Sequence, residues 1–314
     1  MAENEIVDVA IIGGGPAGLT AALYAARARA KTVVFEKAMP GGQIINTDWI
    51  ENYPGMVEGL SGAEIGMLFQ QHAEKWGAEF RTFAEVERVQ PVERHFVLTV
   101  DGEEILARTV ILCTGAVPSR LGVPGEAEYT GRGVSWCATC DGALYRDKTV
   151  AVVGGGDAAV EEAIFLTKFA NKVYVIHRRD ELRATKCIQE RCFANDKIEV
   201  LWSCVVREIE GDGDKVTGVV LDSTKGEEEM RLAVDGVFEF VGVVPHSDLV
   251  KGIVDLDERG FVKIDHKGMT SVPGLYAAGD VTDYPLKQVV TAAGQGAAAA
   301  DDAVKHIDSG VCTI

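Results

Sequence analysis

The chain of 314 residues contains one local pattern twice, and this repeat limits the possible folds more than any other feature. An apolar run leads into GGGPAG at 13–18, and a second apolar run leads into GGGDAA at 154–159. A helix-like stretch and another apolar run follow each loop, and residues 36 and 177 both stand 23 positions after the first glycine. Such glycines permit a tight turn and bring a dinucleotide pyrophosphate onto a helix N-terminus. The repeat predicts an α/β protein with two Rossmann-like dinucleotide-binding domains.

The residue at the end of the second strand indicates which nucleotide each copy binds. In the first copy this residue is Glu36, whose carboxylate can hold a ribose hydroxyl. The second copy has His177, Arg178 and Arg179 there, with Arg183 one turn further on. Arginines attract a 2′-phosphate, which an acid would repel. The first copy therefore suits a ligand with a free ribose, such as FAD, and the second suits NADPH; a solvated basic face is the alternative for the arginines.

A pair of cysteines in the sequence WCATCDG, at 136–142, lies between the two glycine loops. Such a pair can form a reversible disulfide or half of a zinc site. A zinc site needs two more ligands, and the chain has neither a second CxxC nor a suitably spaced histidine pair. We interpret Cys137 and Cys140 as a redox pair and expect no metal site. Asp141 is the candidate acid/base, with a cap or turn as its alternative role, and a helix N-terminus after the pair would favour a thiolate.

Charge and cysteine usage narrow the class of protein further. The net charge of −17 argues against nucleic acid or an anionic membrane as the main partner. We expect neither a signal peptide nor a membrane-spanning segment. The odd count of 7 cysteines indicates a reducing, cytoplasmic setting. Cys113 is interpreted as a core residue, and Cys187, Cys192, Cys204 and Cys312 as structural or incidental.

The remaining patterns predict the other elements and two boundaries. Helices are expected at about 19–29 and 61–76, from the second glycine loop to about 169, and at 288–306. Strands are expected at 6–12, 31–35, 109–112, 149–153, 172–176 and 237–244, and further strands within 79–100 and 198–235. Loops at 40–43 and 51–55 could lay backbone against a flat ligand. A strand followed by Gly279 and Asp280 places a carboxylate at a strand end. Prolines near 116–118 and 243–246 suggest hinges around an inserted unit.

The motifs GGGPAG, GGQ, ENYPG, TGA, WCATCDG, GGGDAA, HRRDELR and AGD closely resemble, in this order, the low-molecular-weight thioredoxin reductases. The resemblance covers essentially the whole chain. It implies an FAD-binding domain of 1–117 and 246–314, an NADPH-binding domain of 118–245 that carries the CxxC, and a homodimer. It further implies an NADPH-dependent reductase whose partner is oxidised thioredoxin. The larger disulfide reductases differ, because they carry their cysteines near the first loop and add a C-terminal dimerisation domain; here 40–55 contain no cysteine and the chain ends at 314.

The resemblance also implies site residues, position by position. Flavin contacts carried over are Gly13, Gly15, Pro16, Ala17, Glu36, Gly42, Gln43, Asn52, Thr114, Gly115, Asp280, Gln288 and Val289. Lys287 stands where the family usually has arginine, which keeps the charge but loses the planar fork. NADPH contacts carried over are Gly154, Gly156, Asp157, Ala158, His177, Arg178, Arg179 and Arg183. By the same pattern Cys140 faces the flavin, Cys137 attacks the partner's disulfide, and the inserted domain rotates between half-reactions.

Two alternatives stay open. One is a related dithiol oxidase, or a reductase for another carrier such as a glutaredoxin-like or peroxidase-linked protein. Surface residues set the choice of carrier, and the sequence does not reveal it. The other alternative is a flavin-bound redox sensor without turnover, which would be indicated by a degraded CxxC or glycine loop. Neither motif is degraded in this chain.

Overall fold

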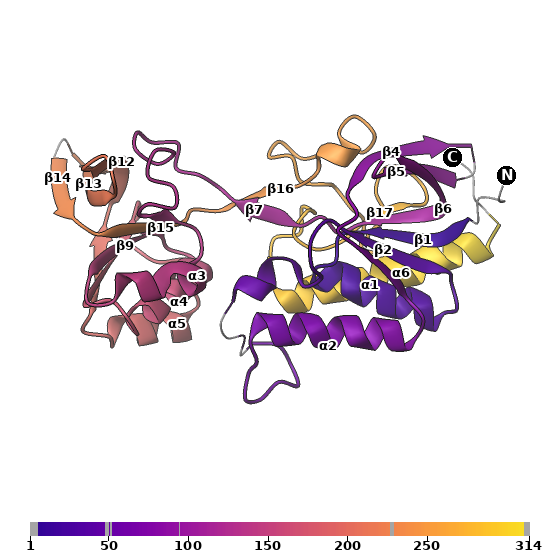
Figure 1. Ribbon diagram of the computed structural model, residues 1–314, viewed down its shortest axis with the longest axis horizontal. Helices are drawn as coiled ribbons and strands as arrows, with labels where there is room; N and C mark the ends of the chain where they lie inside the picture. Colours follow the sequence, from indigo (N-terminus) through magenta and orange to yellow (C-terminus); the bar gives the residue numbers. More distant parts are fainter. Residues whose placement is uncertain (1–5, 48–49, 51, 94, 227–228, 311–314) are drawn as a thin grey trace. The chain divides into compact units, whose positions relative to one another are not determined.

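The computed structural model describes residues 6–47, 50, 52–93, 95–226 and 229–310. The chain forms two compact units: unit 1 consists of 1–117 with 244–314, and unit 2 of 118–243. Figure 1 labels their helices and strands. The sequence expectations that involve Glu51, Glu227 and Cys312 lie outside the described residues.

Unit 1 is built on one sheet in the strand order β3-β2-β1-β6-β5-β4, with β17 paired to β6. Its strands are β1 (Val7–Ile12), β2 (Thr32–Glu36), β3 (Glu79–Thr82), β4 (Val86–Val92), β5 (His95–Val100), β6 (Glu103–Leu112) and β17 (Leu275–Ala277). Strands β3, β2, β1, β6 and β17 run parallel, whereas β4 and β5 extend the sheet antiparallel. The carboxyl ends of β1, β2, β6 and β17 therefore share one edge, where open α/β sheets bind ligands.

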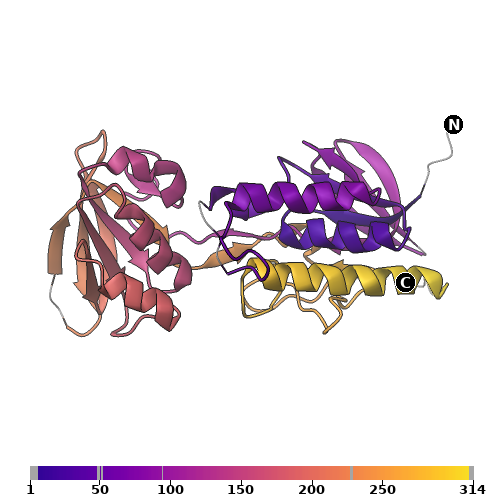
Figure 2. The ribbon, with the colours of Figure 1, turned by 90° about the horizontal axis from the view of Figure 1, so that it is seen from below.

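Three helices of unit 1 run side by side along one face of this sheet: α1 (Pro16–Arg27), α2 (Gly62–Lys75) and α6 (Val289–Asp308) (Figure 2). Helix α1 packs closely on α6 because both present alanines to a shared core, including Ala22 of α1 and Ala300 of α6. Helix α2 begins at Ser61, whose side chain forms a capping box with Glu64. Short 3-10 turns, η1 (Gly42–Asn46) and η3 (Asp248–Val250), complete the unit.

Unit 2 repeats the parallel arrangement on a smaller scale. Its sheet has the order β11-β10-β9-β15-β8, and a second sheet has the order β12-β13-β14. The elements are β8 (Val134–Ser135), α3 (Ala138–Asp141), η2 (Gly142–Tyr145), β9 (Thr149–Gly154), α4 (Asp157–Leu166), β10 (Lys172–His177), α5 (Lys186–Phe193), β11 (Ile198–Trp202), β12 (Cys204–Gly211), β13 (Val216–Ser223), β14 (Glu229–Ala233) and β15 (Gly236–Phe240). Two apolar clusters cover the two faces of its parallel sheet.

The expectation of one buried strand over 237–244 is wrong. Strand β15 ends at Phe240, and a separate strand β16 (Val243–Pro245) begins three residues later. Gly242 lies between them with a φ of 131°, a conformation that few residues other than glycine adopt and that turns the chain out of the sheet. Strand β16 pairs instead with β7 (Ala116–Pro118), so the two passages between the units run as a two-stranded ribbon.

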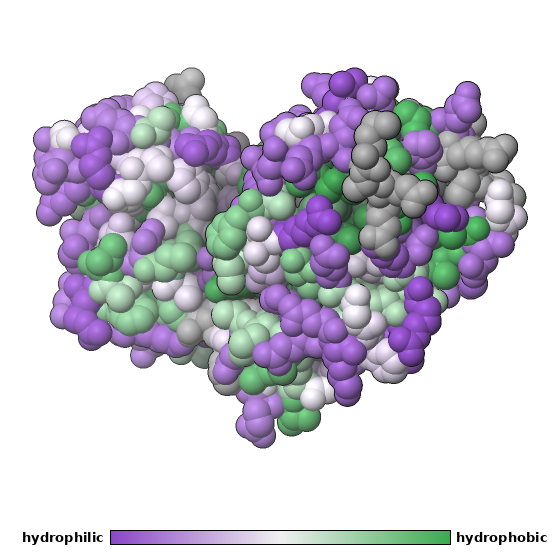
Figure 3. All heavy atoms as spheres, turned by 45° about the vertical axis from the view of Figure 1, so that its right-hand side comes forward, coloured by the Kyte–Doolittle hydropathy of each residue, from purple (hydrophilic) through white to green (hydrophobic). Residues whose placement is uncertain are grey.

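The surface is mainly polar, as Figure 3 shows for one face, in keeping with the charge of −17. On unit 1, a cavity of about 410 Å³ opens between α1, α2 and α6; its lining includes Leu23, Tyr24, Phe69 and Val290. No helix among the described residues is both long and apolar enough to cross a membrane.

Candidate active site

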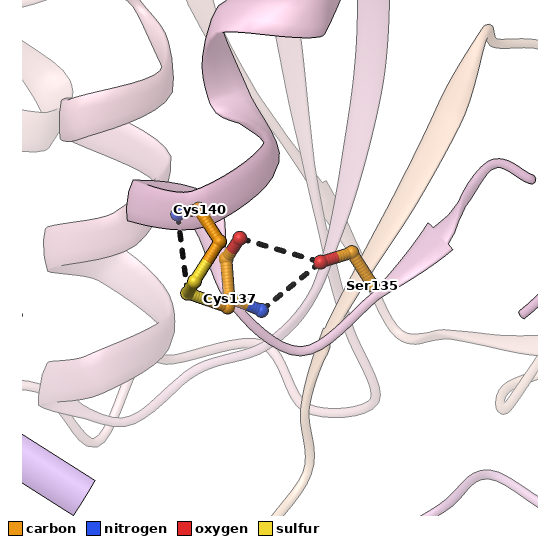
Figure 4. The surroundings of a disulfide bond; sticks show 3 residues. All are labelled: Ser135, Cys137 and Cys140. Carbon is orange, nitrogen blue, oxygen red and sulfur yellow. Dashed lines mark hydrogen bonds between the residues drawn. A yellow bond between two sulfur atoms is a disulfide. The ribbon is translucent and has the colours of Figure 1, made fainter. Parts of the chain in front are cut away.

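The two cysteines of the CxxC form a disulfide in unit 2, with their Cα atoms 5.3 Å apart. The amide of Cys140 donates a hydrogen bond to the Cys137 sulfur at 3.1 Å. The Ser135 hydroxyl lies on the opposite side of Cys137 (Figure 4). Its Oγ accepts from the Cys137 amide at 3.0 Å and donates to the Cys137 carbonyl at 3.3 Å. Because the cysteines are bonded to each other, the redox interpretation is favoured over half of a zinc site.

The expectation of a helix beginning after the pair is wrong. Cys137 is itself the N-cap of the short turn α3, which starts at Ala138, between the two cysteines. The reason is the extended backbone of Cys137, with φ −140° and ψ 96°, which already directs the chain into the turn. Asp141 ends this turn and is half-buried. Burial raises the pKa of Tyr145 to about 12, and the nearby Asp141 charge adds to that effect.

The remaining described cysteines are free thiols in different surroundings. Cys113 and Cys192 are buried, Cys187 is exposed and Cys204 is intermediate. Burial strongly raises the pKa of the Cys113 thiol, as expected for a core residue. Cys187 and Cys192 lie on different faces of α5, since the first is exposed and the second is buried.

The first glycine loop is tight against the protein and open toward solvent. A methyl group on Gly13 would lie 2.3 Å from the carbonyl oxygen of Cys113, and one on Gly18 would lie 1.9 Å from the Gly13 oxygen. At Gly15 the nearest atom to such a methyl group would be the Cα of Gly42, at 3.8 Å. Gly15 also caps α1. The loop therefore exposes a helix N-terminus that a pyrophosphate can approach.

Glu36 lies directly beside this loop. One of its carboxylate oxygens accepts from the Gly14 amide at 2.7 Å, and the other accepts from the Ala38 amide at 2.8 Å. These bonds fix the carboxylate, and each oxygen keeps a lone pair for a ribose hydroxyl. The other predicted flavin residues near the loop lie at the start of α1 (Pro16, Ala17), in η1 (Gly42, Gln43) and after β6 (Thr114, Gly115).

Distant parts of unit 1 meet at the start of α6. The Asn52 amide donates to the side-chain oxygen of Gln288 at 3.0 Å, and Gln288 caps α6 just before Val289. The Lys287 ammonium lies 4.4 Å over the Phe261 ring and donates to the carbonyl oxygens of Asp280 at 3.1 Å and Thr282 at 2.5 Å. Lys287 is therefore held by the main chain next to the predicted flavin residues.

Asp280 and Gln295 follow on the same edge of the sheet. Burial raises the pKa of Asp280, and the neighbouring Lys287 charge opposes this shift. Gln295 on α6 accepts from the Gly279 amide at 2.7 Å through its side-chain oxygen. Its side-chain nitrogen is buried and has no acceptor in the described part of the chain. No sequence pattern predicts Gln295, because it stands in an alanine-rich helix without a motif of its own.

The second glycine loop repeats the geometry of the first with a different neighbour. A methyl group on Gly154 would lie 2.5 Å from the Phe240 oxygen, and one on Gly155 would lie 2.3 Å from the His177 ring. The ring is therefore packed against the loop. Burial lowers the pKa of His177, and its Nε2 is buried without a partner among the residues that the structure describes. The other predicted NADPH residues lie at the start of α4 (Gly156, Asp157, Ala158), on the exposed loop after β10 (Arg178, Arg179) and beside Gly156 (Arg183).

The arginine loop is anchored by residues that no motif predicts. The Ser203 amide donates to the Arg179 carbonyl at 3.1 Å. The Thr224 hydroxyl shares its one proton between the Ser203 carbonyl at 3.1 Å and the Arg178 carbonyl at 3.3 Å. Ser203 has a φ of 56°, a left-handed conformation that is uncommon outside glycine. Ser203 and Thr224 flank β12 and β13 of the second sheet and stand 24 and 46 residues beyond the loop residues that they contact, a distance that local patterns do not span.

Comparison with known proteins agrees with this geometry. The family model described as "Pyridine nucleotide-disulphide oxidoreductase" matches residues 7–296. Thioredoxin reductase of Mycolicibacterium smegmatis is 50% identical, over 96% of both chains. Thioredoxin reductase of Bacillus subtilis is 43% identical over 98% of this chain and 97% of its own. The crystal structure of Lactococcus lactis thioredoxin reductase superposes with a TM-score of 0.94 at 42% identity, covering 96% of this chain and 99% of the other.

These similarities define a flavin-dependent, pyridine-nucleotide-linked disulfide oxidoreductase. The chain belongs to the pyridine nucleotide-disulphide oxidoreductase family, in the branch of the thioredoxin reductases. Its cofactors are accordingly FAD and NADPH, and its fold is the pair of Rossmann-type domains expected from the repeat.

The residues present fit both cofactors. In unit 1, the open position over Gly15 and the free amide nitrogen of Gln295 offer a helix N-terminus and a buried donor to FAD. In unit 2, the free His177 Nε2 and the exposed Arg178 and Arg179 offer polar and positive groups to the 2′-phosphate of NADPH.

Proposed function

We propose that this protein reduces the disulfide of oxidised thioredoxin with electrons from NADPH. The observation that carries the proposal is the Cys137–Cys140 disulfide, which lies in the same unit as the arginine loop. The names of the relatives supply the carrier, since they are called thioredoxin reductases. A reductase for a glutaredoxin-like or peroxidase-linked protein is the alternative, and the experiment below separates the two.

Each unit has its own task in this proposal. Residues 1–117 and 246–314 form the FAD-binding domain, and Gly13, Gly15, Glu36, Asp280 and the start of α6 hold the dinucleotide. Residues 118–245 form the NADPH-binding domain, of which the compact unit 2 includes 118–243. When bound, FAD accepts a hydride from NADPH and returns two electrons to a disulfide, chemistry that side chains lack.

Reduced Cys137 then acts as the nucleophile. Its thiolate attacks one sulfur of the thioredoxin disulfide, forms a mixed disulfide and releases the first thioredoxin thiolate. The Cys140 thiolate attacks the Cys137 sulfur next, which re-forms the Cys137–Cys140 disulfide and releases the second thioredoxin thiolate. The contact from the Cys140 amide to the Cys137 sulfur supports this order, because an N–H donor stabilises a thiolate at Cys137.

Protons and domain movement complete the cycle. Asp141, which ends the turn that both cysteines share, is the proposed acid/base for the thiols. The cysteines must meet the flavin in one half-reaction and thioredoxin in the other. In this proposal the NADPH-binding domain therefore rotates about β7 and β16 between the two half-reactions.

The decisive experiment measures NADPH oxidation by the FAD-loaded protein with oxidised thioredoxin. The Cys140→Ser variant should lose essentially all thioredoxin reduction, because the internal disulfide can no longer form. Cys187→Ser is the matched control, since Cys187 is an exposed free thiol of the same unit, and it should keep wild-type turnover. If NADPH bleaches the flavin while thioredoxin stays oxidised, the carrier is wrong and the alternative carriers should be assayed next.

A homodimer in the cytoplasm is the proposed state of the protein. The cavity between α1, α2 and α6 is bordered by Tyr24, 44% exposed, and Val290, 40% exposed, and a second copy could cover this apolar surface. Light scattering should report a dimer that becomes a monomer in Tyr24→Arg/Val290→Asp. Met230→Asp, at an exposed apolar position of unit 2, should stay dimeric. A cytoplasmic location suits reversible cysteine chemistry.

A further inference from the structure

Two buried carboxyl groups of unit 2 have no place in the chemistry above. Glu126 is 3% exposed and Glu239 is 0% exposed. The Oε1 atom of each is buried without a hydrogen-bond partner in the described part of the chain. The Glu126 carboxyl lies close enough to Glu239 to raise its pKa, through its negative charge and through direct side-chain interaction. Two adjacent ionised carboxylates would repel each other in this buried site, and a single proton held between the two carboxyls would remove that repulsion.

The second oxygen of each carboxyl reaches a group near the redox cysteines. Glu239 Oε2 accepts from the Trp136 indole N–H at 3.0 Å, and Glu126 Oε2 accepts from the Gly122 amide. The Arg120 guanidinium lies 4.6 Å over the Trp136 ring. The indole is therefore contacted at its N–H by Glu239 and on its ring face by Arg120. Trp136 is also the residue directly before Cys137.

Strand β15 holds the cysteine segment at two successive positions. Phe238 pairs in register with Ser135, whose hydroxyl binds both the amide and the carbonyl of Cys137. Glu239, the next residue, holds Trp136. Resting on the proposed function, we propose that Glu239 and Glu126 are positioning residues for the redox disulfide. The pair holds Trp136, and with it the Cys137 segment, only while it shares one proton.

The surroundings of the pair make it sensitive to alkaline pH. Burial, and then the negative charge of Glu126, raise the pKa of Glu239 to about 8; the Trp136 N–H opposes that rise. The apolar cluster on this side of the sheet includes the ionisable Tyr129, Tyr174 and Cys204, none of which is positively charged.

Loss of the shared proton would leave two adjacent carboxylates in an apolar site, and their repulsion would break the network that holds Trp136. Arg120 lies over the indole ring, so it does not replace the proton between the carboxyls. A glutamine at 239 would not depend on pH. Its amide oxygen can accept from Trp136 while its amide nitrogen donates to Glu126.

The test follows two properties of the FAD-loaded protein between pH 6.5 and 9.5. The first is the fluorescence of Trp136, taken as the difference between each protein and its Trp136→Phe counterpart. The second is the rate of thioredoxin reduction by NADPH, beside the rate of ferricyanide reduction, which needs the flavin but not the cysteines. The proteins are the wild type, Glu239→Gln, Glu126→Gln and the control Glu199→Gln, which changes one exposed charge of unit 2.

In the wild type and in Glu199→Gln, we expect a fluorescence transition near pH 8 and a fall in thioredoxin reduction above it. Both changes should vanish in Glu239→Gln and Glu126→Gln. At pH 9 the two variants should then exceed the wild type by up to about tenfold, the factor for one pH unit beyond a pKa. Ferricyanide reduction should follow one pH profile in all four proteins.

The outcomes separate this inference from the proposed function. A wild type without the fluorescence transition, or a Glu239→Gln variant that keeps it, would overturn the shared proton whatever the activity. A transition that vanishes in Glu239→Gln while the thioredoxin rates of both proteins fall together would overturn the positioning role. Ferricyanide reduction without any thioredoxin reduction would instead reject the proposed carrier, and the fluorescence would still decide the fate of the pair.

Discussion

The two glycine loops of the molecule share the order strand, loop and helix but have different neighbours. In unit 1 a methyl group on the first glycine, Gly13, would strike the carbonyl oxygen of Cys113 at 2.3 Å. In unit 2 a methyl group on Gly154 would strike the carbonyl oxygen of Phe240 at 2.5 Å. The Phe240 oxygen belongs to β15, which pairs with β9, the strand that leads into the second loop. The Cys113 oxygen belongs to the residue just after β6, which pairs with β1, the strand that leads into the first loop. The first glycine is thus required by the protein's own sheet in both units.

The neighbours of the second glycine differ, and we propose that this difference decides which dinucleotide each loop binds. Gly14 donates its amide to the Glu36 carboxylate, whereas Gly155 packs against the His177 ring, next to two exposed arginines. In the proposed function, the repeat therefore provides a common pyrophosphate site, and the residue at the end of the second strand selects the ribose. A single substitution in a glycine loop should abolish binding of its cofactor, and a substitution at the end of the second strand should change only which dinucleotide is preferred.

The largest expected effects come from alanine at the first glycine of each loop. Gly13→Ala should be purified almost without FAD, because its methyl group meets a backbone oxygen and its φ is 104°. Gly154→Ala should keep FAD but lose flavin reduction by NADPH by more than about 100-fold, since displacing the loop spoils the helix N-terminus. Flavin absorbance per chain and stopped-flow bleaching measure the two effects.

Gly226→Ala is the control for both variants, since no atom lies within 4 Å of its added methyl group. This control should match the wild type in both measurements. A Gly13→Ala protein with one FAD per chain would show that the sheet contact does not determine the loop.

The double variant Arg178→Ser/Arg179→Ser should change the nucleotide preference of unit 2. Each charge-assisted bond to the 2′-phosphate contributes about 1.5–3 kcal/mol, so the KM for NADPH should rise about 10- to 100-fold for each arginine that binds it. The KM for NADH, which lacks that phosphate, should change little. Arg231→Ser removes an exposed arginine from β14 and serves as the control. An equal rise for both nucleotides would place the arginines outside the phosphate site.

The site residues that could be predicted from the sequence are those that stand in short local motifs. The two loops, Glu36, the arginines and the CxxC each follow from a few adjacent residues, and the strands and helices that flank the two glycine loops match the prediction to within a few residues. Helix α5 after the arginine loop was not predicted, and the turn α3 begins between the cysteines. The break between β15 and β16 was missed because the apolar run continues through Gly242, and only its φ of 131° shows the turn.

Pairings between distant residues could not be predicted. Neither Glu126 nor Glu239 stands in a motif, and a single acid in a sequence carries no sign of a second one beside it. Gln295 and Thr224 are equally unmarked. Their roles come from tertiary contacts to Gly279 and to the arginine loop, which no periodicity encodes.

A third comparison concerns the strand beside each loop. Residue Ile12, just before Gly13, pairs with Leu112, and Val153, just before Gly154, pairs with Glu239. The pKa of Glu239 is about 8 when folded against 4.5 ordinarily, so the folded protein binds its proton more tightly. The free energy of unfolding should therefore fall as pH rises from about 4.5 to about 8, by an amount on the order of a few kcal/mol.

Glu239→Gln and Glu239→Leu, the latter giving unit 2 the residue of unit 1, should both remove this slope. The leucine variant should be the less stable of the two at pH 5, because it leaves the Trp136 indole without an acceptor. Melting temperatures across pH measure the slope, with Glu199→Gln as the control. A slope unchanged in Glu239→Gln would mean that another group titrates.

The smallest expected effect tests the support of the arginine loop. In unit 1 the corresponding residue, Glu36, is held by the amides of Gly14 in the glycine loop and of Ala38 just after the strand. Thr224→Val removes one hydroxyl whose proton is shared between the carbonyls of Ser203 and Arg178, both of which contact the arginine loop or belong to it. A neutral hydrogen bond contributes about 0.5–1.5 kcal/mol, so the KM for NADPH should rise about two- to tenfold while kcat at saturation stays the same. Thr217→Val, at an exposed position of β13, should leave the KM unchanged. If the KM for NADH rose equally, Thr224 would support the whole nucleotide site; a rise confined to NADPH would show that unit 2 attains its selectivity through a loop held from outside the Rossmann fold.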